Sequence, residues 1–214
     1  ADESRRLDEQ SVEALRAGLE VYREALEQAR SLADYDRGRH EIKLGPTLID
    51  TLLPETQAAR TVARLLQADA FLLAQHNEPD RAIDSCRAIL ATARSIGDEP
   101  TTISQLVRIA IDSFAARTVR RVLGQGEPSD EALAALQDLV LDERDQPRPW
   151  YACRGDRAMF TELLRRIADG EVPLSALSDS NGLDKGPKRE GYLSGLASVG
   201  IWYQYSVMLR WFNE

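Results

Sequence analysis

Three residues in the second half of this sequence have the types and the spacing for a polar site: Arg108, Asp112 and Trp150. Arg108 and Asp112 are four positions apart beside an apolar stripe, so a helix would place them on one face. A guanidinium, a carboxylate and an indole that converge between helices would form a polar pocket for a substrate or a small ligand. The same arginine–aspartate spacing is also typical of a structural ion pair, so both interpretations stay open.

The last part of the chain offers a different kind of surface. Residues 192–212 carry almost no charge before Arg210 and include the aromatic residues Trp202, Tyr205 and Trp211. The segment is long enough to span a bilayer, but its serines and glycines weaken that interpretation. We expect a helix buried in the bundle, and a face turned toward a membrane or a protein partner is the alternative. These three aromatic residues are therefore candidate interaction residues.

The sequence contains none of the familiar catalytic motifs. It has no glycine-rich phosphate loop, no nucleophile elbow and no HExxH motif. Its two histidines and two cysteines lack zinc-site spacing, and the apolar stripe around Cys86 favours a buried free thiol over a disulfide with Cys153. The acidic cluster at residues 142–145 fits the polar end of a helix better than a metal site. We predict no catalytic or metal-binding residues and no cofactor.

Composition indicates a soluble helical protein with an acidic surface. The 214 residues are 43% hydrophobic and 29% charged, with a formal net charge of −8. A chain of this length buries enough apolar surface to fold without disulfides. The acidic balance weighs against a general nucleic-acid binder, which needs a clustered basic surface, although a local basic patch is compatible with it.

Glutamate–proline pairs punctuate the stretch from about residue 58 to residue 141, which has the apolar periodicity of four amphipathic helices. Proline suits the first turn of a helix, and an acidic neighbour faces the positive end of the helix dipole. We therefore predict helix starts at Glu78-Pro79, Glu99-Pro100 and Glu127-Pro128. Gly97 and Gly126 precede the last two pairs and offer left-handed ends for the helices before them.

The same periodicity predicts which side chains point inward and where the other elements lie. After Pro100 the apolar positions include Ile103, Leu106 and Ile111, which we expect in the core. Beyond these helices we predict one long helix over residues 8–33, a loop with one short helix over 34–54, and a helix over 150–168. The expected organisation is a helical-hairpin domain over 1–170, a loop or linker over 171–189, and an aromatic helix over 190–214 packed on the same domain.

Three segments of the chain resemble a family of uncharacterised bacterial α-helical proteins. They are GDEPTTISQLVRIA at residues 97–110, GEPSDEALAALQDLV at 126–140 and RGDRAMF at 154–160. In that family similar segments follow a membrane anchor or signal segment. The resemblance implies a helical fold and a place in the cell envelope or outside the cell, and it brings no reaction and no site residues. This sequence shows no such anchor, so a cytoplasmic location stays open.

A second resemblance is to tetratricopeptide-like hairpins. Residues 77–83, with the sequence NEPDRAI, and the Cys86 and Ile89 that follow are similar to the turn and second helix of such a repeat. The glutamate–proline pairs are unevenly spaced, so they set no fixed period. The fold class predicted is all-α, a tetratricopeptide-like array of antiparallel helical hairpins with about seven main helices and no significant sheet.

The function predicted from these features is that of a non-enzymatic scaffold that binds a protein or peptide partner, because hairpin arrays present concave surfaces. The alternative is a helical enzyme or small-molecule binder that uses a polar pocket between helices. We expect no nucleic-acid partner and no membrane association of this chain, and the sequence does not define its oligomeric state. A groove would favour the partner interpretation, and a deep closed pocket would favour the alternative.

Overall fold

The computed structural model describes residues 6–45, 47–48 and 50–174, and in these residues every regular element is a helix. The prediction of an all-α fold is confirmed, and the described part of the chain contains no strand. The tetratricopeptide-like arrangement stays a prediction. The elements are α1 (Glu9–Val21), α2 (Arg23–Arg30), the 3-10 helix η1 (Ser31–Asp34), α3 (Pro54–Gln75), α4 (Pro79–Arg94), α5 (Thr102–Leu123), α6 (Asp130–Arg144) and α7 (Arg148–Ala168).

The chain divides into two compact units. The first comprises Ala1–Glu41 and Leu53–Cys153, and the second comprises Ile42–Leu52 and Arg154–Glu214. Helix α7 begins in the first unit and continues into the second. The aromatic helix predicted over 190–214 lies outside the described residues, as does most of the predicted 171–189 loop, so the predicted domain limits stay predictions. Among the described residues, none of the helices combines the length and the apolar character needed to cross a bilayer.

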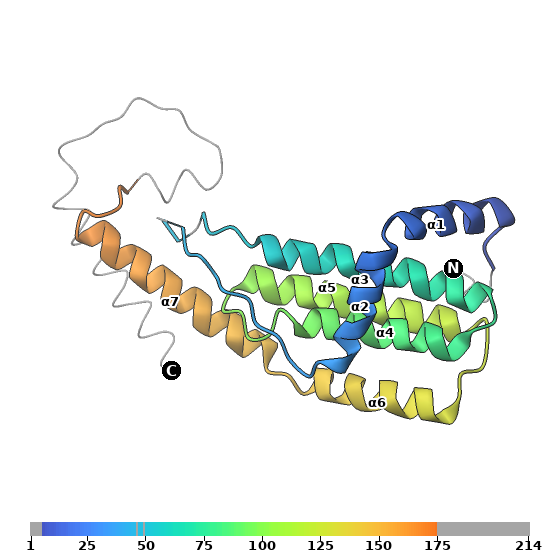
Figure 1. Cartoon of the computed structure of the whole chain (residues 1–214). Helices are drawn as coiled ribbons and strands as arrows, with labels where there is room; N and C mark the ends of the chain where they lie inside the picture. Colours follow the sequence, from blue (N-terminus) through green and yellow to red (C-terminus); the bar gives the residue numbers. More distant parts are fainter. Residues whose placement is uncertain (1–5, 46, 49, 175–214) are drawn as a thin grey trace. The chain divides into compact units, whose positions relative to one another are not determined.

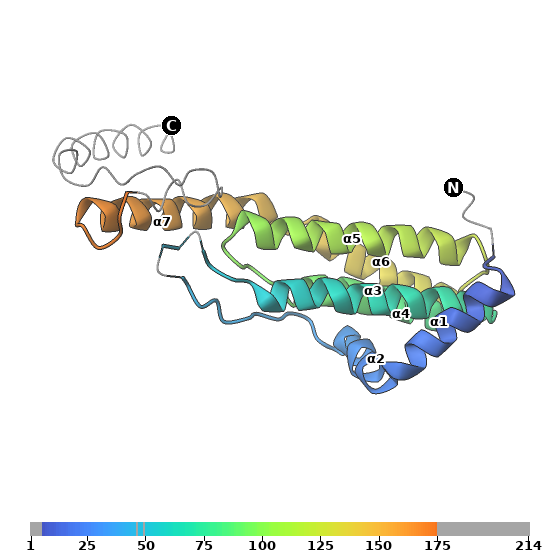
Figure 2. The same cartoon turned by 90° about the horizontal axis from the view of Figure 1, so that it is seen from above.

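Helix α4 lies at the centre of the first unit. It packs on α3, α5, α6, α2 and η1, and Figures 1 and 2 show α3 to α6 running side by side. Alanine is the commonest residue on its buried surface, and Ala82, Ala88 and Ala93 have no exposed surface. Small side chains let neighbouring backbones approach closely, while Ile83 and Ile89 fill the remaining volume. The core of this unit is therefore built around α4.

The predicted long helix over residues 8–33 is wrong in one respect, because the chain bends at Tyr22. Tyr22 ends α1 with φ −109° and ψ 21° and is followed directly by α2, which lies across α3 and α4 (Figure 1). No proline or glycine stands at the bend. The bend lets Leu19 and Leu26 both become buried, so packing on the core overrides the local helical preference.

A buried polar contact fixes α2 to this core. The Arg30 guanidinium donates to both carboxylate oxygens of Asp69, at 3.0 and 2.5 Å, and the Ser85 hydroxyl donates to Asp69 Oδ2 at 2.6 Å. Asp69 is 3% exposed, so its charge depends on these donors. The contact joins α2, α3 and α4.

The glutamate–proline pairs mark helix starts less uniformly than predicted. Helix α4 does begin at Pro79, but α5 begins two residues after Pro100 and α6 two residues after Pro128. In those two helices a hydroxyl provides the N-cap: Thr101 accepts a hydrogen bond from the Ser104 amide at 3.0 Å, and Ser129 serves α6 in the same way. The hydroxyl of the N-cap residue accepts a hydrogen bond from a backbone N–H group of the first turn. The proline side chain has no acceptor, so the N-cap residue sets the start of the helix.

The predicted left-handed helix ends are correct at Gly97 and wrong at Gly126. Gly97 has φ +62°, and a Cβ there would lie 2.5 Å from the Gly38 carbonyl oxygen, so both backbone conformation and space require glycine. Gly126 is not among the described glycines with positive φ, which are Gly97 and Gly170. Before α4, the residue with positive φ is Asn77.

Residues 42–52 of the second unit contain no helix among those described, contrary to the short helix predicted within 34–54. Leu48 has φ 65° within a turn whose Thr47 and Thr51 hydroxyls make local hydrogen bonds. Its side chain is buried in a cluster with Leu163 of α7 and Val172. A turn with these local bonds presents Leu48 to the cluster without a helix.

Replacement of Ala88 by leucine tests the central position of α4. Ala88 has no exposed surface, so the larger side chain has to displace neighbouring helices. We expect Ala88→Leu to lower the free energy of unfolding by about 2 kcal/mol in urea denaturation. Ala58→Leu on the exposed side of α3 is the matched control and should change it by less than about 0.5 kcal/mol. Equal effects of the two substitutions would contradict the central packing of α4.

Candidate functional site

Helix α5 buries a polar face. Its buried residues include Ser104, Gln105 and Arg108, whereas Ile103 and Leu106 are 60% and 58% exposed. The expectation that Ile103 and Leu106 lie in the core is therefore wrong, although Ile111 is buried as predicted. The reason is that the buried polar groups hold the turn before the helix, and an apolar side chain could not replace their hydrogen bonds.

Arg108 and Gln105 hold this turn by its carbonyl groups. The Gln105 amide donates to the carbonyl oxygens of Glu99 and Gly97 at 2.9 and 3.2 Å, and Arg108 donates to the Gly97 oxygen at 2.9 Å. Buried backbone carbonyls of a loop need such partners. The buried polar face of α5 thus serves the connection between α4 and α5.

A single buried carboxylate, that of Glu143, binds Arg108 and two further arginines. Glu143, near the end of α6, is 5% exposed. It accepts two hydrogen bonds from Arg108, at 2.9 and 3.0 Å, one from Arg94 at 2.8 Å and one from Arg148 at 2.5 Å. These arginines belong to α5, α4 and α7, so the Glu143 cluster joins four helices.

Two further carboxylates balance the charge of the Glu143 cluster. Asp142 pairs with Arg94, and Asp112 pairs with Arg148. Arginine suits this role because its planar fork serves two acceptors at once. With three arginines and three acids the formal charge of the cluster is zero, which lowers the cost of keeping it away from water.

Asp112 is the least well satisfied member of the cluster. Its side chain is 19% exposed, and Arg148 contacts Oδ2 without the alignment of a hydrogen bond. Burial raises the pKa of Asp112 to about 6, with a contribution from the charge of Glu143, while Arg148 and Arg108 act in the opposite direction. The Asp112 carboxyl therefore changes its protonation state just below neutral pH.

The structure brings two of the predicted site residues together and leaves the third apart from them. Arg108 and Asp112 belong to the same cluster, joined through Glu143 and Arg148 rather than by a direct ion pair. Trp150 is 55% exposed on the first turn of α7, where its ring meets Tyr151 edge-on at 5.7 Å between centroids. Trp202, Tyr205 and Trp211 lie outside the described residues.

An open apolar groove adjoins this cluster. Helices α5 and α6 both pack on α4, and apart from the Arg108–Glu143 contact at one end their backbones stay apart, so a channel of about 920 Å³ remains between them over α4. Its floor is formed by the buried residues Leu90, Ala115 and Leu136. Ile109 of α5 and Val140 of α6, which are 43% and 47% exposed, form its walls. We refer to this channel as the α5–α6 groove.

The rim of the α5–α6 groove is basic. Arg117 and Arg120 line it from α5, and Arg144 lines it from α6. Asp112 and Glu143 contribute the carboxylates of the lining, at the end where Arg148 pairs with both of them. An apolar floor with arginines along the edge is an arrangement suited to an amphipathic, acidic ligand.

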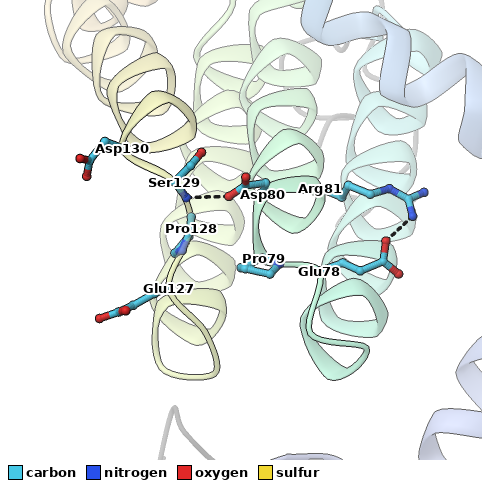
Figure 3. Close-up of a pocket in the computed structure, with 8 residues that line it drawn as sticks. All are labelled: Glu78, Pro79, Asp80, Arg81, Glu127, Pro128, Ser129 and Asp130. Atoms are coloured by element: carbon cyan, nitrogen blue, oxygen red, sulfur yellow. Dashed lines mark hydrogen bonds and ion pairs between the residues drawn. The ribbon is translucent and has the colours of Figure 1, made fainter.

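A second hollow, of about 670 Å³, lies where α4 and α6 begin (Figure 3). The Ser129 amide donates to Asp80 at 2.7 Å, and Glu78 pairs with Arg81. Figure 3 shows Glu127 pointing away from these contacts. These bonds tie the two helix starts together, and the hollow has no apolar floor comparable to that of the groove.

Other reactive groups in the described residues give no competing site. Cys86 and Cys153 are both free, which agrees with the prediction of a free thiol at Cys86. Burial raises the pKa of Cys86 to about 12, so this thiol is unreactive at neutral pH. Within the part of the chain that the structure describes, no group of three or more histidine, cysteine, aspartate or glutamate residues could hold a metal ion.

Sequence reasoning missed Glu143, Arg94 and Arg148 as members of the cluster. The 142–145 segment is indeed the end of a helix, but Glu143 is buried there rather than solvated. One signal could have indicated this. A glutamate at a helix C-terminus opposes the helix dipole, so it is favourable only where nearby cations compensate it.

Comparison of the chain with protein-family models, with curated proteins and with solved structures finds no match.

Replacement of Asp112 by asparagine tests the electrostatics of the cluster. Because the folded-state pKa of Asp112 is raised from 3.8 to about 6, the native state holds this proton more tightly than the unfolded state does. Ionisation of Asp112 should therefore lower the stability of the wild-type protein as pH rises from about 4 to about 6. We expect Asp112→Asn to remove this loss and to gain about 2 kcal/mol relative to the wild type between pH 4 and pH 7.

Urea denaturation of both proteins across this pH range measures the difference. Asp138→Asn, which changes an exposed carboxylate of α6, is the control and should follow the wild-type curve. A gain for Asp112→Asn that does not vary with pH would show that Asp112 does not ionise in this range.

Proposed function

We propose that this protein is a non-enzymatic helical scaffold whose α5–α6 groove binds an amphipathic helix of a protein or peptide partner. The observation that carries the proposal is the open channel over α4, with a buried floor at Leu90 and Leu136 and exposed walls at Ile109 and Val140. Exposed apolar side chains around an apolar channel are typical of a helix-binding groove.

The dimensions of the groove suit a short helix. Its α5 wall extends from Ile109 to Arg120, which corresponds to about 17 Å at the helical rise of 1.5 Å per residue. A ligand helix of about three turns would cover this length. Leu106 lies three positions before Ile109 of the groove lining, so it extends the same apolar face of α5.

The charge of the rim defines the polar face of the ligand. Four arginines and two carboxylates line the groove, although the chain as a whole carries a net charge of −8. Both carboxylates already contact Arg148. A ligand with acidic residues beside its apolar stripe would complement Arg117 and Arg120, whereas a basic ligand would meet like charges.

A small amphipathic molecule is the second candidate ligand. The groove volume of about 920 Å³ falls in the range of small-molecule sites, and an apolar floor with a basic rim would also accept a fatty acid-like anion. We favour the helix because the walls are exposed along the groove, and most small-molecule sites enclose their ligand.

A designed peptide tests the leading proposal. The probe is a fluorescein-labelled amphipathic helix of about four turns, with leucine on one face and glutamate on the other. We expect it to bind with micromolar affinity in fluorescence anisotropy, and we expect Ile109→Asp or Val140→Asp to weaken binding by about tenfold or more, because each places a carboxylate against the apolar face of the probe.

Two controls distinguish binding in the groove from non-specific binding of the probe. Val21→Asp changes an exposed apolar residue of α1, at 77% exposure, and should leave the affinity unchanged. A probe with lysine in place of glutamate should bind more weakly. Equal affinity of the wild type and both groove variants would refute the proposal, and displacement of the peptide by dodecanoate at the groove would favour the second candidate.

A further inference from the structure

A second group of arginines lies along the contact between α5 and α3. Arg64 and Arg117 lie over the Phe114 ring, at 5.9 and 5.1 Å from its centroid, and Arg121 lies over the Phe71 ring at 4.7 Å. Two of these contacts, Arg64 with Phe114 and Arg121 with Phe71, join α3 and α5, and the contact of Arg117 with Phe114 lies within α5. We refer to them as the arginine–phenylalanine seam.

The spacing along each helix makes the seam a continuous surface. Arg60 and Arg64 are four positions apart on α3, as are Arg117 and Arg121 on α5, so each pair lies on one helical face. From Arg60 to Phe71 the seam extends over about 17 Å of α3. The hydrogen bond from the Gln67 amide to the Thr118 hydroxyl, at 3.0 Å, holds the two helices in this register.

Several of these arginines lack the acidic partners that arginines have elsewhere in the protein. Arg30, Arg94, Arg108 and Arg148 each pair with a carboxylate. In contrast, Arg60, Arg64 and Arg117 form no ion pair with any described residue. The Nε atom of Arg60 is buried and has no hydrogen-bond partner within the described chain. Arg60, Arg64 and Arg117 therefore present positive charge that no described carboxylate neutralises.

Contact with the Phe114 ring prepares Arg64 and Arg117 to bind an anion. The face of an aromatic ring attracts a guanidinium and holds it in one orientation. The N–H groups at the edge of the guanidinium remain available. Such an edge matches the two oxygens of a carboxylate or phosphate. Holding the side chain in advance lowers the conformational entropy lost when an anion binds.

A purely structural role accounts for only part of the seam. Basic residues in the last turn of a helix stabilise the negative end of its dipole, and this applies to Arg121 of α5. Arg60 and Arg64 lie in the first half of α3, where the dipole gives them no such benefit. The helix dipole therefore does not account for Arg60 and Arg64.

We propose that the arginine–phenylalanine seam binds an acidic segment of a protein, through its side-chain carboxylates. The seam meets the α5–α6 groove at Arg117, which belongs to both, and extends beyond it along α3 through Arg60 and Arg64, which do not line that groove. A nucleic acid fits less well, since phosphate backbones engage many basic residues at once, and a chain with a net charge of −8 would repel the rest of an extended polyanion. A short acidic segment meets the seam without that repulsion.

The probe for this proposal is a fluorescein-labelled peptide of about ten glutamates, measured by anisotropy at low ionic strength. We expect the wild-type protein to bind it, with an affinity that falls as salt is added. Arg64→Gln, at an exposed position, should weaken binding about threefold or more, and Arg60→Gln combined with Arg64→Gln about tenfold. Arg64→Lys should recover only part of the loss, because lysine keeps the charge but lacks the planar fork.

Controls distinguish this surface from general electrostatics and from the groove. Arg23→Gln removes an exposed arginine of α2 and should leave peptide affinity unchanged. Ile109→Asp should also leave it unchanged, so failure of the groove proposal and failure of this one are separable. The proposal is overturned if the wild type does not bind the peptide, if Arg64→Gln binds like the wild type, or if an oligothymidine of similar charge binds more tightly.

Discussion

The burial of α4 on several sides is the constraint from which the other features of the first unit follow. A helix surrounded in this way needs small side chains on most of its surface, and Ala82, Ala88 and Ala93 provide them. Several helices therefore pack on the surface of α4. Helices α5 and α6 both pack on α4 while their backbones stay apart, and the α5–α6 groove is the space left between them. The groove is thus a product of the packing rather than an addition to it.

The same constraint explains why so much charge is buried. Helix α4 ends at Arg94, and its neighbours bring Arg108 and Arg148 to the same end, where apolar packing does not satisfy the loop carbonyls. Glu143 offers all three guanidiniums a common acceptor. Buried ion pairs add little net stability compared with apolar packing, but each leaves a costly unpaired charge if its partner is lost. The cluster therefore specifies which helices meet at this end more than it stabilises them.

Much of the helical framework could be predicted from the sequence, because local signals determine it. Pro79 begins α4 as predicted, and Gly97 ends the turn after it in the left-handed conformation. The predictions failed where distant residues decide. Apolar periodicity placed Ile103 and Leu106 in the core, yet the buried face of α5 is set by Arg108, whose partner Glu143 lies 35 positions away.

The candidate site shows the same limit. Arg108 and Asp112 were identifiable as a pair on one helical face, and both do belong to the Glu143 cluster. The acceptor that joins them could not be identified, because Glu143 stands in an acidic run that is typical of a solvated helix end. The groove could not be predicted from the sequence either, because it depends on how far apart α5 and α6 pack on α4. Local sequence patterns predict the elements, whereas the site depends on how those elements pack.

The order of the helices has a consequence for how the chain folds. Helices α3, α4 and α5 are consecutive, and α4 packs on the helix before it and on the helix after it, which favours rapid folding. The Glu143 cluster also requires α6 and the start of α7, so we expect it to form after the three-helix core. Local opening of the native protein should then begin at this cluster, and the cluster end of the α5–α6 groove would be its most mobile part while α4 stays packed.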